Sequence, residues 1–403
     1  MRLGKSVSEM PRRRLTDLMF VGAFFGLLAL PAITHDWESD PGIEATEQRR
    51  AAPLPEIPDS WPALLAWPKQ EDAYLADHFG GRTDMVLAFN QMRYALFGET
   101  PSEQTLFGRR GRLFLTSHSA ERPYELIAAI CGGGIDDAAL DRTARELDLF
   151  RQQAAAQVPD SYLMIVPSAP ALYPGDLPKW ARRQCPFETV VDRLVTRLPE
   201  GEARRRILYP RQAMLAAEGK GDMVPPTHFH WQGLGPATAM RDFAQDHLGL
   251  APVLDMPLMA VTERSDIFQM VPGIPTEGTV QRPDPGAVGV EYCQGPSCFP
   301  ELGPAAATIY DMSRLRSPQA GGRKLLILSD SFGAAIVPWA ASYFGTVWHF
   351  SLNDVGRLPP AERDAFRRLV FTEYQPDTVL YLCHDGAAQY WPSQVAAPAL
   401  SGK

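Results

Sequence analysis

The sequence predicts an α/β fold in which a parallel sheet is covered by helices on both faces. From about residue 160 onward, short apolar strands alternate with amphipathic helices. The segment 324–328 reads KLLIL, a nearly continuous apolar run typical of a strand buried on both faces of a parallel sheet. Of the 403 residues, 45% are hydrophobic and 21% are charged, which excludes a wholly disordered chain.

The apolar periodicity predicts the individual elements in chain order. A helix is expected at 73–94, a strand-turn-strand at 106–115 and a second helix at 137–157. The alternating part then follows. Strands are expected at 162–166, 206–209, 324–328, 346–350 and 377–382, and helices at 187–198, 236–248, 334–344 and 360–369.

The N-terminus resembles an export signal. Five basic residues and one acidic residue occupy positions 1–14, and an uncharged run of sixteen residues follows at 18–33. At 1.5 Å per residue this run spans roughly 24 Å, somewhat less than a hydrocarbon core. It fits a signal peptide or a short membrane anchor, and the lack of a clear small-x-small cleavage site favours the anchor. We therefore expect a basic stretch with a signal-anchor helix at 1–35, a linker at 36–66 and one globular domain at 67–403, placed in the periplasm on the inner membrane, or secreted after cleavage.

Charge and cysteines restrict the partners. The net charge of −8 argues against a nucleic-acid-binding protein and against an extended groove for a polyanion. An exported chain can form disulfides, and Cys293 and Cys298, which flank a Gly-Pro turn, are the expected pair. The five cysteines leave at least one thiol unpaired. Cys383 follows an apolar strand and is expected in the core.

Ser331 is the first candidate for chemistry. It lies in the segment 329–333, SDSFG, where a buried strand ends and a helix is expected to begin. Ligands of parallel sheets bind at the carboxyl ends of the strands, and amides at a helix start can stabilise an oxyanion. The alternative is an N-cap with a turn glycine.

His230 is the second candidate, because a nucleophilic serine needs a base within hydrogen-bond reach. It lies in the segment 228–231, HFHW. A packed histidine beside Trp231 is the alternative. His228 and His230 would share one face of an extended segment, but no third metal ligand is evident nearby. No metal and no cofactor are expected.

Several segments in order resemble the alginate-type, SGNH-hydrolase-like polysaccharide O-acetyltransferases, the AlgJ/AlgX family. The matched segments are 47–53 (EQRRAAP), 74–82 (YLADHFGGR), 107–114 (FGRRGRLF, with Arg112 in place of the family's Trp), the pairs Val166-Pro167 and Tyr173-Pro174, 228–231, 329–333 and 375–379 (QPDTV). The resemblance covers about residues 45–385. Because no C-terminal carbohydrate-binding module follows the matched segments, we expect the chain to resemble AlgJ more than AlgX.

The resemblance implies an SGNH-hydrolase-like domain and a serine acyl-enzyme. Ser331 would attack an acetyl donor, and His230 would take its proton and later activate a sugar hydroxyl. The implied acceptor is an exopolysaccharide, and the implied donor is a membrane-bound O-acyltransferase. Backbone amides near Ser331 would hold the oxyanion. The candidate substrate-binding and oxyanion residues are Ser329, Asp330, Gly333, Trp231 and Asn353.

The chain departs from the family at the acid of the triad, because the family's Asp falls on His228. A histidine does not supply the fixed negative charge that stabilises the imidazolium. Three outcomes are open: a backbone carbonyl orients His230, another carboxylate such as Asp222 or Asp385 replaces the acid, or the enzyme is degenerate. His384 and Asp385, just after the last strand, are a competing base and acid.

Three functions remain in view. The first is an envelope O-acetyltransferase acting on a secreted polysaccharide. The second is a carbohydrate esterase with the same residues, in which water replaces the sugar hydroxyl. The third is a non-catalytic binding subunit of a polysaccharide modification or export complex, which the histidine at 228 would explain.

Overall fold

The computed structural model describes residues 10–33, 42–43, 50–78, 80–119, 121–132, 135–183 and 185–400. The expected basic residues at 1–9, parts of the expected linker, and Glu47, Gln48 and Arg49 of the first matched segment lie outside the described residues. The chain forms two compact units. One comprises residues up to Pro101 together with 269–275, and the other comprises 102–268 and 276–403.

The first unit contains the helices α1 (Met10–Ile33), α3 (Trp61–Asp77) and α4 (Arg82–Phe97). The expected helix at 73–94 is wrong as a single element, because Gly80 and Gly81 interrupt it and Gly81 adopts a left-handed φ of 69°. α3 begins at Trp61, inside the expected linker, with the Ser60 side chain accepting from the Ala63 amide. Within this unit the Asn90 side chain donates to the carbonyl of Pro272.

The expected anchor at 18–33 falls within α1. Among the residues that the structure describes, no helix combines the length and the apolar character needed to cross a membrane.

The second unit is built on a seven-stranded sheet with the order β4-β3-β11-β9-β10-β8-β7. Its strands are β3 (Ser161–Val166), β4 (Ile207–Leu208), β7 (Glu291–Gln294), β8 (Met312–Arg316), β9 (Lys324–Ser329), β10 (Thr346–Ser351) and β11 (Thr378–His384). The five strands from β4 to β10 are parallel, as the sequence predicts. β8 and β7 are antiparallel, so the expected all-parallel sheet is wrong at this edge.

Two small antiparallel pairs complete the strands of the second unit. β1 (Thr105–Phe107) and β2 (Leu113–Leu115) form the expected strand-turn-strand. β5 (Leu258–Arg264) and β6 (Glu277–Pro283) form a hairpin that the sequence analysis did not predict. β5 is largely exposed, although it begins with the apolar run LMAV.

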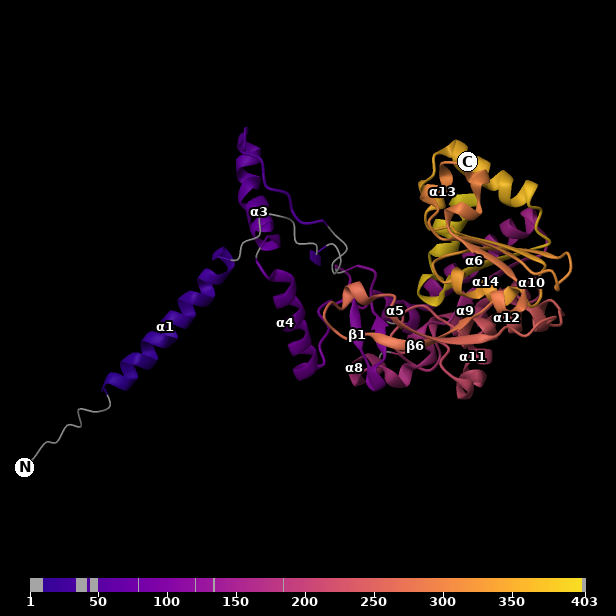
Figure 1. Ribbon diagram of the computed structural model, residues 1–403. Coiled ribbons are helices and arrows are strands. Elements are labelled where there is room, and N and C mark those ends of the chain that lie inside the picture. Colours follow the sequence, from indigo (N-terminus) through magenta and orange to yellow (C-terminus); the bar gives the residue numbers. More distant parts are fainter. Residues whose placement is uncertain are drawn as a thin grey trace, which may run out of the picture. The chain divides into compact units, whose positions relative to one another are not determined.

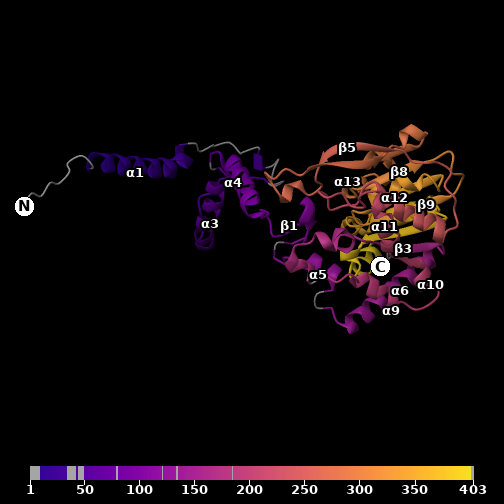
Figure 2. The ribbon, with the colours of Figure 1, turned by 90° about the horizontal axis from the view of Figure 1, so that it is seen from below.

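Helices cover both faces of the sheet (Figures 1 and 2). The helices of this unit are α5 (Glu125–Cys131), α6 (Asp137–Gln157), α7 (Ala169–Leu172), α8 (Lys179–Arg182), α9 (Val190–Arg197), α10 (Glu202–Arg206), α11 (Arg211–Ala217), α12 (Leu234–Arg241), α13 (Ala305–Thr308), α14 (Val337–Ala340), α15 (Pro360–Arg367) and α16 (Ala397–Leu400). Phe150 of α6 packs against Tyr381 of β11. Phe243, in the π-helical turn after α12, packs against Tyr162 of β3. Tyr162 pairs with Leu380 in the sheet, so these two contacts lie on opposite faces.

Two disulfides stabilise the second unit. The predicted bond between Cys293 and Cys298 is confirmed, and Cys383 is free and buried in the core as expected. A second bond, which the sequence did not suggest, joins Cys131 at the end of α5 to Cys185. It closes a loop of 54 residues, which in the chain-entropy account stabilises the fold by about 4 kcal/mol.

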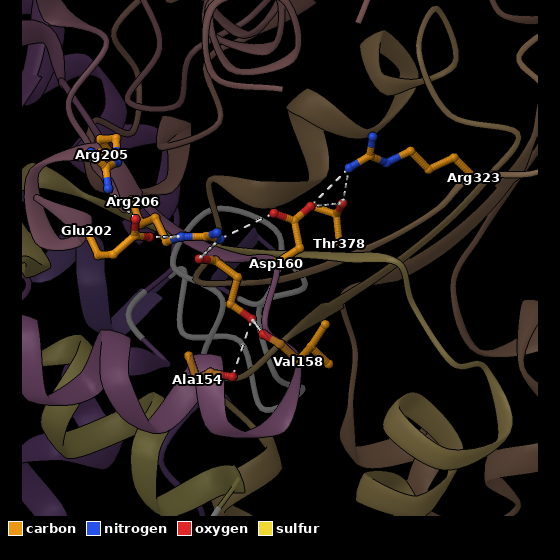
Figure 3. Close-up of polar contacts among 9 residues, drawn as sticks. Ala154, Val158, Asp160, Glu202, Arg205, Arg206, Arg323 and Thr378 are labelled. Atoms are coloured by element: carbon orange, nitrogen blue, oxygen red, sulfur yellow. Dashed lines mark hydrogen bonds and ion pairs between the residues drawn. The ribbon is translucent and has the colours of Figure 1, made fainter. Parts of the chain in front are cut away.

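A polar network connects the amino ends of four parallel strands (Figure 3). The Asp160 carboxylate, just before β3, accepts from Arg206 at 3.2 Å, from Arg323 at 2.9 Å and from the Thr378 hydroxyl at 2.7 Å. These partners precede β4 and β9 or begin β11. One carboxylate therefore fixes the starting points of four neighbouring strands.

We expect Asp160→Ala to lower the free energy of unfolding by about 2 kcal/mol, because a half-buried network of two cations and a hydroxyl loses its common acceptor. Urea denaturation measures this change. Asp354→Ala is the control: it removes an ion pair to Arg357, whose side chain is 78% exposed, and should cost less than about 0.5 kcal/mol. Equal effects of the two substitutions would contradict a structural role for the network.

Candidate active site

Ser331 lies on the turn between β9 and the helical segment that begins at Gly333, and its side chain is exposed. Asp330, which precedes it, is buried and accepts a hydrogen bond from the Phe332 amide at 2.9 Å. A Cβ atom at Gly333 would lie 1.9 Å from the Ser329 hydroxyl oxygen and 2.7 Å from His349 Nε2, so only glycine fits at this position, two residues after Ser331. The turn therefore places the Ser331 hydroxyl at the carboxyl end of a central strand, open to solvent.

The segment that carries His230 packs directly on this turn. His230 Nε2 lies 2.9 Å from Ser331 Oγ. The buried indole of Trp231 donates to the Phe332 carbonyl at 2.8 Å, and the Phe229 ring packs edge-on against the Phe332 ring. The structure thus brings together the two candidates that the sequence singled out for base and nucleophile.

Asp266 holds the other side of the imidazole. Its Oδ2 lies 2.6 Å from His230 Nδ1, and its two oxygens also accept from the amides of Phe229 and His230. Burial alone would raise the pKa of Asp266, but the hydrogen bond and charge of His230, together with these amides, lower it below its ordinary value. The carboxylate is therefore ionised at neutral pH, and Nδ1 donates to it, which leaves Nε2 to accept the serine proton.

His228, the residue on which the family's acid falls, does not contact His230 Nδ1; Asp266 does. The His228 side chain is buried, with Nε2 at 3.2 Å from Glu263 and Nδ1 at 3.0 Å from the Thr227 hydroxyl. The first of the three open outcomes, in which a backbone carbonyl orients His230, is not seen either, because Asp266 occupies that position. His228 and His230 face different carboxylates, and the described part of the chain holds no group of three or more metal-ligating side chains.

The other carboxylates that the sequence offered have other partners. Asp222 pairs with Arg112, and Asp385 accepts from the Ser168 hydroxyl and amide. His384 does not pair with Asp385: its Nδ1 lies 2.7 Å from Asp330. The competing base and acid at 384–385 are thus not a pair.

Of the remaining candidate residues, Ser329 and Gly333 support the turn that carries Ser331, whereas Asn353 is exposed. Ser329 is buried and its hydroxyl contacts His349 Nε2 at 2.8 Å, while Gly333 gives its amide to the Asp330 carbonyl, so both support the turn. Asn353 is exposed beyond β10, where the Leu352 amide donates to the Ser329 carbonyl. Its Oδ1 accepts from the Trp391 indole at 3.3 Å. Among the described residues no acceptor lies on the Ser331 amide, which leaves that donor for an oxyanion.

No protein family model and no curated protein matches the chain. Similar solved structures include a DHHW family protein from Eubacterium siraeum, 15% identical, with a TM-score of 0.48, covering 74% of this chain and 95% of that one. The O-acetyltransferase domain of Pseudomonas putida AlgJ is 14% identical, with a TM-score of 0.36, covering 74% and 99%. Pseudomonas aeruginosa AlgX is 12% identical, with a TM-score of 0.42, covering 73% and 66%.

The geometry of Ser331, His230 and Asp266 is that of a nucleophile, a base and an orienting acid. Such a set can transfer an acyl group through an ester on the serine. Sequence reasoning missed Asp266 because it follows an exposed strand and belongs to no matched segment. The only local feature that could have indicated Asp266 is the Ser265-Asp266 pair directly after the residues of β5.

We expect Asp266→Asn to slow acylation of Ser331 by a factor of about 10⁴, because the amide stabilises neither the imidazolium nor the required tautomer. Release of nitrophenol from p-nitrophenyl acetate measures the rate. Glu263→Gln is the matched control, since it alters the carboxylate facing the neighbouring His228 and should leave the rate within a few-fold. A larger loss of acylation rate in Glu263→Gln than in Asp266→Asn would show that Asp266 is not the acid of the triad.

Proposed function

We propose that the chain is an O-acetyltransferase that modifies a secreted exopolysaccharide through a serine acyl-enzyme. The observation that carries the proposal is the continuous chain of hydrogen bonds from Ser331 through His230 to Asp266. The order of the sequence segments that resemble the alginate-type O-acetyltransferases supports the acyl group and the acceptor class. Asp266 also removes the motive for a non-catalytic subunit, which was the missing acid at position 228.

The residues divide the reaction into two half-reactions. Ser331 Oγ attacks the carbonyl of an acetyl ester while His230 Nε2 takes its proton, and the leaving group departs with that proton. A sugar hydroxyl then attacks the serine ester, gives its proton to His230, and Ser331 Oγ leaves and is reprotonated. The Ser331 amide faces the oxyanion in both steps. With water in place of the sugar hydroxyl, the same residues would act as a carbohydrate esterase.

Location and partners follow as part of this proposal. The basic stretch, the apolar run at 18–33 and the two disulfides support an exported protein held at the inner membrane and facing the periplasm. A membrane-bound O-acyltransferase would supply the acetyl group there. An exposed nucleophile suits a polymer acceptor, because a chain can lie across an open surface.

Intact-protein mass spectrometry after incubation with an activated acetyl ester tests the proposal. We expect one acetyl group on the wild-type protein, none on Ser331→Ala and strongly reduced labelling of His230→Ala, because the serine then lacks its base. Ser393→Ala, a hydroxyl in another part of the fold, is the control and should be labelled like the wild type. A folded wild-type protein that carries no adduct would refute the acyl-enzyme.

The products separate the transferase from the esterase. Acetylated oligosaccharide supports the transferase, whereas free acetate formed at the same rate with and without saccharide supports the esterase.

A further inference from the structure

A cavity of about 530 Å³ lies at the carboxyl end of β11, close to the candidate active site. Its walls include His118, Arg122, Glu125, Gly386, Gln389 and Tyr390. The His118 ring lies 6.1 Å from the Phe229 ring, which in turn lies 4.9 Å from the ring of His230. One aromatic side chain therefore separates the wall of this cavity, called the His118 cavity below, from the base of the triad.

The walls of the His118 cavity are fixed by the fold. α5 carries Arg122's partner Glu125 on one side and is tied at its end by the disulfide from Cys131. On the other side the chain passes so close to α5 that a Cβ at Gly386 would lie 2.1 Å from the Leu126 side chain. The cavity has the size of pockets that bind small molecules or single units of a polymer.

A buried, unpartnered nitrogen lies at this wall. His384 is 5% exposed, and its Nδ1 is bound to Asp330, but among the described residues its Nε2 has no hydrogen-bond partner. Nε2 lies 3.2 Å from the position of a Cβ at Gly386, a residue of the cavity wall, and the His118 ring packs edge-on against the His384 ring. Asp330 accepts a hydrogen bond from His384 Nδ1, which leaves Nε2 as a buried acceptor beside Gly386.

The polar groups of the cavity carry no net charge. Arg122 and Glu125 neutralise each other at 2.9 Å. The pKa of His118 is lowered, mainly by desolvation and by the neighbouring His384, so this imidazole is neutral at neutral pH. Burial raises the pKa of Tyr390 to about 12, so its hydroxyl stays protonated. The amides of Gln389 and Gln394 and the Tyr390 ring complete a surface of neutral donors, acceptors and one aromatic face.

We propose that the His118 cavity binds one sugar unit of the acceptor polysaccharide and that this unit is uncharged. Hydroxyl groups match the neutral amides, the phenol and the His118 imidazole, whereas a uronate carboxylate would meet no unpaired cation among the residues that line the cavity. The net charge of −8 acts in the same direction, since it disfavours the approach of a polyanion. The inference rests on the proposed function for its acceptor class, but binding tests it without any acetyl transfer.

Binding of hexasaccharides to the full-length Ser331→Ala protein in detergent, measured by calorimetry, tests the cavity. The probes are hexamers of β-1,4-linked glucose, mannose and N-acetylglucosamine, and a hexamer of β-1,4-mannuronate. We expect at least one neutral hexamer to bind, with the mannuronate hexamer weaker by about tenfold or more. Tyr390→Ala should weaken the neutral hexamer by about tenfold, while Tyr390→Phe keeps most of the affinity because the ring remains.

Tyr343→Ala is the matched control, a half-buried tyrosine that lines a different cavity, and should bind like its parent. Preference for mannuronate, absence of binding by every neutral hexamer, or equal affinity of Tyr390→Ala and its parent on folded protein would each overturn the inference. The acyl-enzyme is measured separately on the wild type. Sugar binding without an acyl-enzyme would therefore refute the proposed function and leave the binding site standing.

Discussion

The candidate active site depends on one buried carboxylate, that of Asp330. Its Oδ1 accepts from the Phe332 amide, and its Oδ2 accepts from the amide and Nδ1 of His384, while its own amide donates to the Leu382 carbonyl. These bonds join the end of β9 to the end of β11, so the nucleophile turn is fixed to the strand beside it. Without this carboxylate, three donors would be left unsatisfied in the core, at a cost of about 1–3 kcal/mol each.

The same turn also positions the base. The Phe332 carbonyl accepts a hydrogen bond from the Trp231 indole, and the Phe332 ring contacts the rings of both Phe229 and His384. The two neighbours of His230 in the sequence, Phe229 and Trp231, therefore both pack on the turn that Asp330 stabilises, and this positions His230. Ser331 and His230 are far apart in the sequence, but each is positioned by contacts that pass through one or two residues of the 330–332 turn.

The sequence predicted the parts of the molecule whose physics is local. Apolar runs predicted β3, β9, β10 and β11, because a strand buried on both faces has no polar positions to tolerate. The antiparallel strands β7 and β8 were not predicted. β7 is mostly exposed and has no apolar run in its sequence. Cys131 and Cys185 escaped because their pairing depends on where α5 ends in space.

The triad shows the same division between local and distant information. Ser331 and His230 stand within short segments whose residues also build their own support, so a sequence pattern could indicate them. In the resemblance the family's acid falls on His228, but an aligned position does not report which side chain approaches His230 Nδ1. That approach is made by Asp266, a residue 36 positions away, which follows a hairpin that the sequence analysis did not predict.

Asp266 lies at the start of the loop that connects β5 to β6, where the two ends of the loop are held together. The amide of Ser265 donates to the Thr276 carbonyl at 3.0 Å, and the buried Ser265 hydroxyl accepts from the Ile267 amide. The β5–β6 pairing runs up to Arg264 and Glu277, so Asp266 stands two residues beyond a regular ladder. A triad requires only that a carboxylate meet Nδ1 in the correct orientation. A carboxylate held at the base of a loop whose ends are hydrogen-bonded meets that requirement as well as one beside the histidine in sequence. The acid can therefore come from a different part of the chain.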